Sequence, residues 1–304
     1  MDGAPGGWES VPHAEKGRQM LDRPHHELLH AHPRYYDLAF GYRDLNAECG
    51  FLEHLSRHLG RGVLESFLEV CCGPGYHMHH FAGRGVRSYG VDYSAEMVPY
   101  AREKAHRLAT AAGFSGIMGA PTEGRAVPPV GMVLQGDPRE LSLPEAVDLA
   151  FMPWLKLGYL LTDEEVVDQF VTVAKNIGRG GIYVLELDHP AHLFGYAERV
   201  ERQWEMTDEN LHVTVQWGNG KELVDPITHT SEMEVVFDVQ DEGRQETLRD
   251  TAPMRHFTHR ELRALVRLSG VFDWVATFGD LSVTQPFDLS PGARRMVPVL
   301  RCNI

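Results

Sequence analysis

Two hydrophobic periodicities alternate along the middle of the chain. Short apolar runs, which are typical of buried strands, occupy residues 67–71, 86–91, 130–134, 147–152 and 182–187. Apolar positions at helical spacing lie between them, over residues 76–82, 94–112 and 163–177. Strands that alternate with helices at this spacing indicate βαβ units, and such units build a parallel sheet.

The alternation stops between residues 200 and 252. Segments 211–217 and 232–239 change between apolar and polar residues with a period of two, and 245–251 follows a turn at 241–243 as a third strand. This pattern predicts an antiparallel sheet that is inserted into the α/β domain.

The α/β pattern resumes after the insertion. Thr258 and Glu261 form a capping box that predicts a helix up to Ser269. Strands at 274–278 and 296–301 then close the chain. We expect five segments: a flexible N-terminus (1–25), a helical lid (26–66), a ligand-binding core (67–195), the insertion (196–255) and the end of the core (256–304).

Composition narrows the range of partners. The formal net charge of -14 argues against a protein that grips nucleic acid through phosphates, and it disfavours anionic membranes. No apolar run approaches the roughly 20 residues that a membrane span needs. The four cysteines form no CxxC pair and are interpreted as reduced residues of a cytoplasmic protein. A small neutral or cationic molecule remains compatible as a partner.

The most informative segment runs from Leu68 to His77. A strand leads into a turn that contains Gly73 and Gly75, and a helix follows. Glycines there let the backbone approach a ligand closely, and the start of the helix offers free N–H groups. The next strand ends in Asp92, whose carboxylate can accept both hydroxyls of a ribose. Together these features predict a site for a cofactor that contains adenosine.

Two cofactors are compatible with such a site. The NAD fingerprint requires a third glycine for close packing of helix and strand, and Met78 stands at that position. S-adenosylmethionine (SAM) has no pyrophosphate and does not demand that packing. An acidic residue within the first strand, Glu69, is also expected for SAM and would lie near the methionine ammonium. SAM is therefore the predicted cofactor, and NAD is the alternative.

Several motifs, in order, resemble those of class I SAM-dependent methyltransferases. Residues 69–75 resemble their glycine-rich first motif, and 90–97 (GVDYSAEM) resemble the second. Residues 135–141 (QGDPREL) are similar to the segment that faces adenine. The fourth motif and its sequel resemble residues 148–152 and 158–161, and a later glycine motif resembles residues 180–184. The resemblance covers about residues 35–190 and the closing strands, and it extends loosely to bacterial amino-sugar N-methyltransferases.

The resemblance implies a Rossmann-like fold: a seven-stranded, mostly parallel sheet with helices on both faces and the antiparallel sheet inserted. It also implies a set of residues that contact SAM. These are Tyr36, Glu69, Cys71, Gly73, Gly75, His77, Asp92, Tyr93, Met97, Gly136, Asp137, Pro138 and Met152.

Two features depart from the family pattern. Cys71 replaces a small glycine or alanine and is expected to tighten the methionine side of the pocket, and the loop at 113–130 is longer than usual.

In the N-terminal segment, Tyr36 has two interpretations: a lid residue that touches the cofactor, or a core residue of the leading helix. His77 is expected near the methionine carboxylate. The cluster His77-Met-His79-His80 lacks a carboxylate partner in sequence, and no metal site is predicted.

Candidate acceptor-site residues lie after the later strands. Trp154, Tyr159, Trp204 and Arg255 are candidates for binding the methyl acceptor. His189, His256 and Tyr159 are candidates for catalysis, the histidines as general bases. Each of these residues also has a structural interpretation, as packing or hydrogen bonding within the fold.

The predicted activity is methyl transfer from SAM to a nitrogen or oxygen of a small molecule, as in natural-product biosynthesis. Two alternatives remain at this point: a SAM-fold enzyme with other chemistry, such as a cyclase or lyase, and a nucleotide-binding regulatory module. The insertion is expected either to roof the acceptor pocket or to form a contact in a homodimer.

Overall fold

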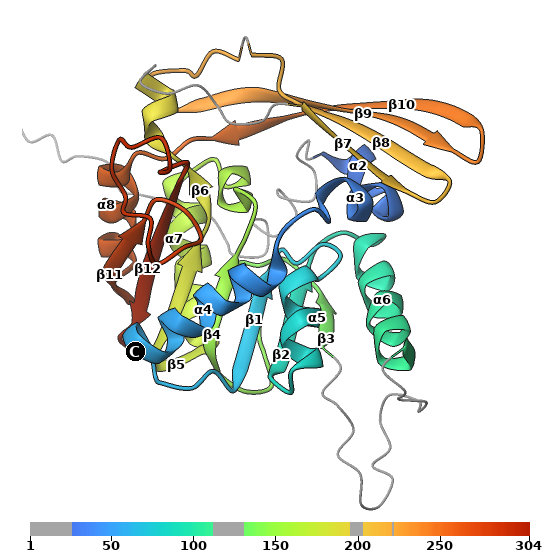
Figure 1. The fold of residues 1–304 in the computed structure, drawn as a ribbon. Coiled ribbons are helices and arrows are strands. Elements are labelled where there is room, and N and C mark those ends of the chain that lie inside the picture. The colour runs from blue at the N-terminus through green and yellow to red at the C-terminus, as the bar shows by residue number, and fades with distance from the viewer. Residues whose placement is uncertain (1–25, 112–130, 195–202, 221) are drawn as a thin grey trace, which may run out of the picture.

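A large twisted sheet forms the centre of the molecule (Figure 1). The computed structural model describes residues 26–111, 131–194, 203–220 and 222–304. The segment expected to be flexible (1–25) and the long loop (113–130) lie outside the described residues. In the part that is described, no helix is long and apolar enough to cross a membrane.

The sheet follows the order β11-β12-β5-β4-β1-β2-β3, with the short β6 paired to β12. Its central strands are parallel, whereas β12 runs antiparallel to both β5 and β11. This confirms the predicted seven-stranded, mostly parallel sheet. The bounds are β1 Ser66–Val70, β2 Arg87–Asp92, β3 Met132–Gln135, β4 Val147–Met152, β5 Ile177–Leu185, β6 Leu187–Asp188, β11 Phe272–Phe278 and β12 Arg295–Cys302.

Helices cover both faces of this sheet. Because strand side chains alternate between faces, Phe67 of β1 packs with the helices on one side, and Leu68 and Val70 pack with those on the other. The first face carries α4 (Leu45–Leu59), α5 (Tyr76–Gly83) and α6 (Met97–Ala111). The second carries α7 (Asp163–Lys175) and α8 (His259–Ser269). Complete capping boxes begin α7, at Thr162, and α8, at Thr258.

The insertion is a separate four-stranded antiparallel sheet in the order β10-β9-β8-β7. Its strands are β7 Gln203–Asp208, β8 Leu211–Trp217, β9 Thr230–Asp241 and β10 Arg244–Arg255. Figure 1 shows this sheet lying across the top of the molecule, beyond the carboxyl ends of β1 and β4. The predicted inserted sheet is therefore confirmed, with β7 as an additional strand.

Two short helices lie between the inserted sheet and the core: α2 (Glu27–His30) and α3 (Pro33–Phe40) (Figure 1). The Asp37 carboxylate of α3 accepts hydrogen bonds from Tyr100 Oη (2.8 Å) and Lys104 Nζ (2.6 Å) of α6. On the other side, Trp204 Nε1 of β7 donates to the carbonyl of Ala39 (2.7 Å). These contacts hold α3 between core and insertion, over the glycine-rich turn.

Some element boundaries differ from those expected. The helix predicted at 163–177 ends at Lys175, because β5 already begins at Ile177 and includes the glycines that were expected to follow the helix. Strand β1 ends at Val70, and Cys71 has a left-handed φ of 55° that starts the turn. The pattern also missed β7, whose Gln203–Asp208 sequence is largely polar and mostly exposed.

Candidate functional site

The glycine-rich turn joins β1 to α5 at the carboxyl edge of the sheet. Gly73 and Gly75 have φ angles of 51° and 76°, in the left-handed region that favours glycine. A hydrogen bond from the Cys72 amide to the carbonyl of Val91 (2.9 Å) ties the turn to β2. The last residue of β2 is Asp92, so the turn and the Asp92 carboxylate lie together, as the sequence predicted.

Asp92 organises this turn. Its carboxylate accepts hydrogen bonds from the Gly73 amide (2.8 Å) and the Ser94 amide (3.0 Å). Burial raises the pKa of the Asp92 carboxyl, and the two amides oppose that rise. An ionised carboxylate can accept about four hydrogen bonds, so Asp92 keeps acceptor capacity for the two hydroxyls of a ribose.

The turn also leaves room for a ligand. Apart from its chain neighbours, a Cβ built on Gly73 would meet one described atom within 4 Å, Cε1 of Tyr36 at 3.8 Å. Gly75 is different, because its Cβ would lie 2.8 Å from the Met78 side chain and 2.9 Å from that of His79. Gly73 therefore leaves open space at the turn, and Gly75 permits the helix to start close to the turn. These residues fit an adenosine cofactor of the SAM type.

Tyr36 and Lys156 lie together over the glycine-rich turn. Lys156 Nζ donates to Tyr36 Oη at 3.1 Å and lies over the rings of Tyr36 and Tyr159, at 5.4 and 5.7 Å from their centres. Burial lowers the pKa of the Lys156 ammonium, but Tyr36, Tyr159 and Asp92 outweigh it and the pKa is raised. Lys156, which the sequence analysis did not single out, is thus a permanently charged group beside the predicted ribose site.

A buried ionic network supports the turn from behind. His77 Nδ1 lies 2.9 Å from Glu69 Oε1, and its Nε2 lies 2.8 Å from Glu48 Oε2. Glu69 also accepts a hydrogen bond from the Met78 amide (2.9 Å). Burial lowers the pKa of His77, but the two carboxylates raise it to about 9. Because both ring nitrogens are engaged, His77 holds Glu69 and α5 in place and presents no free nitrogen to a ligand.

Arg43 extends this network toward β5 and β12. Its Nε donates to Glu48 (2.6 Å), and its Nη1 donates to Glu186 Oε2 (2.9 Å), which also accepts from the Trp154 amide (3.2 Å). Arg295 pairs with the other Glu186 oxygen at 2.9 Å. Burial raises the pKa of Glu186, but Arg43 and Arg295 lower it to about 2. Arg43 Nη2 is buried without a hydrogen-bond partner among the described residues, so it can donate to a carboxylate.

The residues expected around adenosine occupy different environments. Tyr93 Oη bonds with His30 Nδ1 (3.0 Å), and Met97 packs in the core that includes Tyr36. The Gly136 amide donates to the Asp92 carbonyl (3.0 Å), which places 136–138 beside Asp92. Asp137 is paired with Arg139 (2.7 Å), next to the buried Pro138. The Met152 side chain lies in the core against Tyr183.

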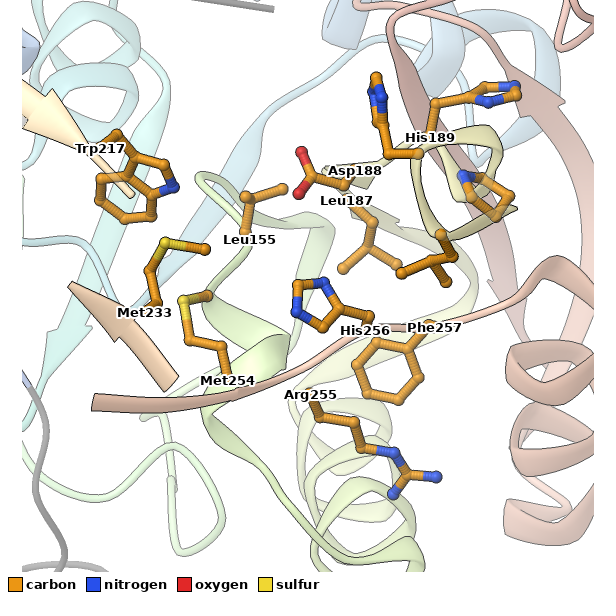
Figure 2. Close-up of a pocket in the computed structure, with 13 residues that line it drawn as sticks. Leu155, Leu187, Asp188, His189, Trp217, Met233, Met254, Arg255, His256 and Phe257 are labelled. Carbon is orange, nitrogen blue, oxygen red and sulfur yellow. The ribbon is translucent and has the colours of Figure 1, made fainter. Parts of the chain in front are cut away.

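A pocket lies between the end of β5 and the insertion (Figure 2). Its apolar wall is formed by Leu155, Trp217, Met233, Met254 and Phe257, and its polar groups come from 188–192 and 255–256. Figure 2 shows the Asp188 carboxylate directed toward the space between Leu155 and Trp217. Among the described residues, no hydrogen bond or ion pair engages that carboxylate.

The predicted acceptor residues are divided between this pocket and the fold around it. Arg255 lies at the pocket, but its guanidinium points away from Asp188 (Figure 2) and pairs with Asp163 (2.6 Å) and Glu261 (2.5 Å). Trp204 packs against Phe40, and the ring of Trp154 lies 4.4 Å from the Arg43 guanidinium. In this arrangement, all three residues have structural partners.

The two candidate histidines both line the pocket but differ chemically. His189 Nδ1 accepts a hydrogen bond from the Ala191 amide (3.1 Å), so in the neutral ring the proton is on Nε2. Burial lowers the pKa of His189, which keeps the ring neutral. His189 is therefore better suited to donate a hydrogen bond than to act as a base. His256 Nε2 lies 2.8 Å from Ser231 Oγ, on the insertion.

Comparison with known proteins agrees with this geometry. Residues 67–118, which include the glycine-rich turn and β2, match the family model described as a methyltransferase domain. The matched segment is the one in which the sequence analysis found the first two motifs that resemble class I SAM-dependent methyltransferases.

The chain is also similar in sequence to a curated enzyme. Over 157 residues it is 26% identical to the dTDP-3-amino-3,4,6-trideoxy-alpha-D-glucopyranose N,N-dimethyltransferase of Streptomyces venezuelae, in an alignment that covers 51% of this chain and 56% of the relative. The alignment thus spans little more than half of that curated relative.

Solved structures share the fold over a longer range. DesVI of Streptomyces venezuelae superimposes with a TM-score of 0.66 at 22% identity, covering 89% of this chain and 98% of DesVI. A SAM-dependent methyltransferase of Clostridium acetobutylicum gives a TM-score of 0.65 at 14% identity, over 89% and 96% of the two chains. The SAM-bound amino pentose methyltransferase CalS10 of Micromonospora echinaspora gives 0.61 at 18%, over 88% and 96%.

Proposed function

We propose that this protein transfers a methyl group from SAM to a nitrogen of a small amine bound in the pocket of Figure 2. The observation that carries the proposal is that the cofactor turn and this pocket approach each other at one segment, Trp154–Tyr159. Leu155 lines the pocket, whereas Lys156 contacts Tyr36 above Gly73. Oxygen is the alternative acceptor atom.

The cofactor would be held by groups already in place. Gly73 and the amides at the start of α5 would approach its methionine end, Asp92 would accept the ribose hydroxyls, and Arg43 Nη2 would face its carboxylate. SAM, when bound, supplies an electrophilic methyl group on a sulfonium. The protein therefore needs to orient the acceptor and exclude water more than it needs to activate the donor.

The pocket favours an amine as the acceptor. The Asp188 carboxylate has no hydrogen bond or ion pair among the described residues. Together with the face of Trp217 and two methionines, it would attract an organic cation through charge and cation–π contact. The names of the relatives support the same class, because the Streptomyces enzyme and CalS10 are described as methyltransferases of amino sugars.

The test combines cofactor binding with acceptor turnover. Calorimetry is expected to show binding of SAM and of S-adenosylhomocysteine (SAH), but not of NAD. A panel of amino sugars and their hydroxyl analogues, including dTDP-3-amino-3,4,6-trideoxy-α-D-glucopyranose, is then assayed for SAH formation. Binding of NAD alone would refute the proposed class, and turnover of hydroxyl analogues alone would refute the amine.

Asp188→Asn tests the acceptor site directly. We expect the KM for the amine to rise at least tenfold, because the charged partner is lost, while the affinity for SAH stays unchanged. Asp273→Asn, on an exposed position of β11, is the matched control. An unchanged KM in Asp188→Asn would place the acceptor elsewhere.

A further inference from the structure

Tyr159 lies between Lys156, which is beside the proposed cofactor site, and His26, which contacts the pocket-wall residues Trp217 and Met233. It ends the short 3-10 helix η1 (Lys156–Tyr159) after β4, and its ring lies beside the Lys156 ammonium. On its other side, its hydroxyl meets His26, whose ring contacts Trp217 of the pocket wall at 5.8 Å between centroids. The Tyr159–His26 pair thus adjoins the wall of the proposed acceptor pocket through Trp217 and Met233.

The hydrogen bonds of His26 define which nitrogen can take a proton. His26 Nε2 lies 2.9 Å from the Met233 carbonyl, which can only accept, so Nε2 must carry the proton. In the neutral ring, Nδ1 is then an acceptor, and Tyr159 Oη lies 2.6 Å from it. Tyr159 therefore donates its proton to His26 and turns the lone pairs of its oxygen away from that ring.

The surroundings of this pair keep the Tyr159 phenol protonated at rest. Burial raises the pKa of the Tyr159 phenol, and Lys156 lowers it, while Tyr36, Asp250 and Cys71 add to the rise. The net effect is a raised pKa, so Tyr159 does not persist as a phenolate. It can pass a proton on only if His26 accepts one at the same moment.

We infer that Tyr159 and His26 form a proton relay for the methyl acceptor, an inference that rests on the proposed function. One proton leaves the acceptor nitrogen for Tyr159 Oη, and the phenol's own proton moves to His26 Nδ1. Tyr159 is unchanged at the end of the step, and His26 becomes an imidazolium that returns its proton to water between turnovers. His26 is a positioning and proton-storing residue that acts through Tyr159.

The relay joins three parts of the molecule. Tyr159 belongs to the core, His26 precedes α2 of the lid, and the Met233 carbonyl belongs to β9 of the insertion. The Leu28 amide donates to Asp250 of β10 (2.8 Å), which fixes α2 against the same sheet. The relay is complete only when the lid and the insertion are both docked on the core.

The tautomer of His26 is measurable without any acceptor. In protein labelled with ¹⁵N-histidine, with the His26 signals assigned by their loss in His26→Gln, we expect the neutral Nε2–H form. Tyr159→Phe should shift the Nδ1 resonance, because that nitrogen loses its hydrogen bond. An Nδ1–H tautomer in the wild-type protein would overturn the relay.

Kinetics test the role of the pair in turnover. With dTDP-3-amino-3,4,6-trideoxy-α-D-glucopyranose as acceptor, Tyr159→Phe and His26→Gln should each lower kcat about 100-fold, the smaller end of general-base effects, without altering SAH affinity. The double variant should lose little more than either single one. Tyr89→Phe, which removes a hydrogen bond to Glu145 (2.7 Å), and His212→Gln are matched controls.

The pH profile separates a relay from a structural role. Because the relay needs Nδ1 without a proton, wild-type kcat should fall on the acid side, and His26→Gln should lose that limb. An acid limb shared by both proteins, or kcat values equal to wild type, would overturn the inference. If the wild-type protein binds no SAM and turns over no acceptor, the proposed function fails instead, while the histidine tautomer still decides whether the pair exists.

Discussion

At the scale of single residues, backbone donors decide what each carboxylate can do. Asp92 and Asp148 each accept two backbone amides, Asp92 at the carboxyl edge of the sheet and Asp148 at the amino edge. Only the first lies beside an open glycine turn. The two residues therefore form a natural pair for separating a ligand-binding role from a structural one.

Asp92→Asn should weaken SAH binding by about 1–3 kcal/mol, the range for losing a hydrogen bond to a charged group. Isothermal calorimetry measures this loss directly. Asp148→Asn, which removes a carboxylate bonded to the Glu65 and Ser66 amides, should leave the affinity unchanged. Equal dissociation constants for wild type and Asp92→Asn would show that Asp92 does not hold the ribose.

The protonation of the buried His77 ring makes the stability of the folded protein depend on pH. Its pKa rises from 6.5 to about 9 in the folded protein, so folding favours the protonated ring. The resulting stabilisation is full below about pH 6.5, declines as the pH rises toward 9, and is lost above it. The change in pKa corresponds to about 3 kcal/mol.

Urea unfolding at several pH values between 6 and 10 measures this contribution. The free energy of unfolding of the wild-type protein should fall across pH 6.5–9, and His77→Gln, although less stable overall, should lack that fall. His212→Gln should keep the wild-type slope, because His212 lies on the inserted sheet. A slope that survives in His77→Gln would assign the effect to other groups.

At the scale of elements, the lid and the insertion share one hydrophobic core. Phe40 of α3 contacts the rings of Tyr36, Trp154, Trp204, Trp217 and Phe237. These residues come from the lid, the core and three strands of the insertion. Phe40 is therefore the point at which the two covering elements depend on each other.

Phe40→Ala should cost about 3–5 kcal/mol, as for other buried phenylalanines, and should loosen α3 and β7–β10 together. Hydrogen exchange read by mass spectrometry should show faster exchange in both elements, and SAH binding should weaken because Tyr36 loses its packing. Phe81→Ala removes a buried ring beneath the main sheet and should not show that joint pattern. Loosening of α3 alone would separate the two elements.

The elements were predictable where one periodicity dominated. Val147–Met152 and Leu211–Trp217 have the predicted bounds, because an apolar run and a period-two pattern each specify a strand. Gln203–Asp208 carries no such pattern, since its pairing with β8 comes from the partner strand. The intrinsic β-propensity of a segment does not reveal a strand that forms because a neighbouring strand pairs with it.

The same distinction applies to the site. The proximity of Gly73 and Asp92 was predictable because the glycine-rich turn and the end of the next strand belong to one short βαβ segment. Three residues that the sequence analysis missed have partners that lie more than a hundred positions away along the chain. They are Lys156 with Tyr36, His26 with Tyr159, and Glu186 with Arg43. Among these, the signal available from sequence was Lys156 itself, a lone cation in the apolar segment 151–160.

At the scale of the whole molecule, repulsion between the excess negative charges opposes the compact folded state. The chain carries a formal net charge of -14, and its buried ionic network holds acidic and basic groups in nearly equal number. The excess of negative charge is therefore mainly a property of the surface. Folding brings these charges closer together, and salt screens their repulsion.

The free energy of unfolding in urea should therefore increase when sodium chloride is raised from 0.02 to 0.3 M at pH 7. Exposed ion pairs such as Arg107–Glu103 would have the opposite dependence, but each contributes little. Sucrose at matched osmolality controls for effects other than screening. A decrease in stability with salt would mean that surface ion pairs outweigh the net repulsion.

The insertion leaves the core and returns to it at the same place. The chain departs through residues 188–193 and comes back through 254–257, and both stretches line the pocket proposed for the acceptor. Neither stretch contributes to the glycine turn or to Asp92. One contiguous stretch of gene thus encodes most of the wall of the proposed acceptor pocket. If that proposal holds, recombination at the two ends of the stretch would exchange the substrate and leave the proposed cofactor site intact.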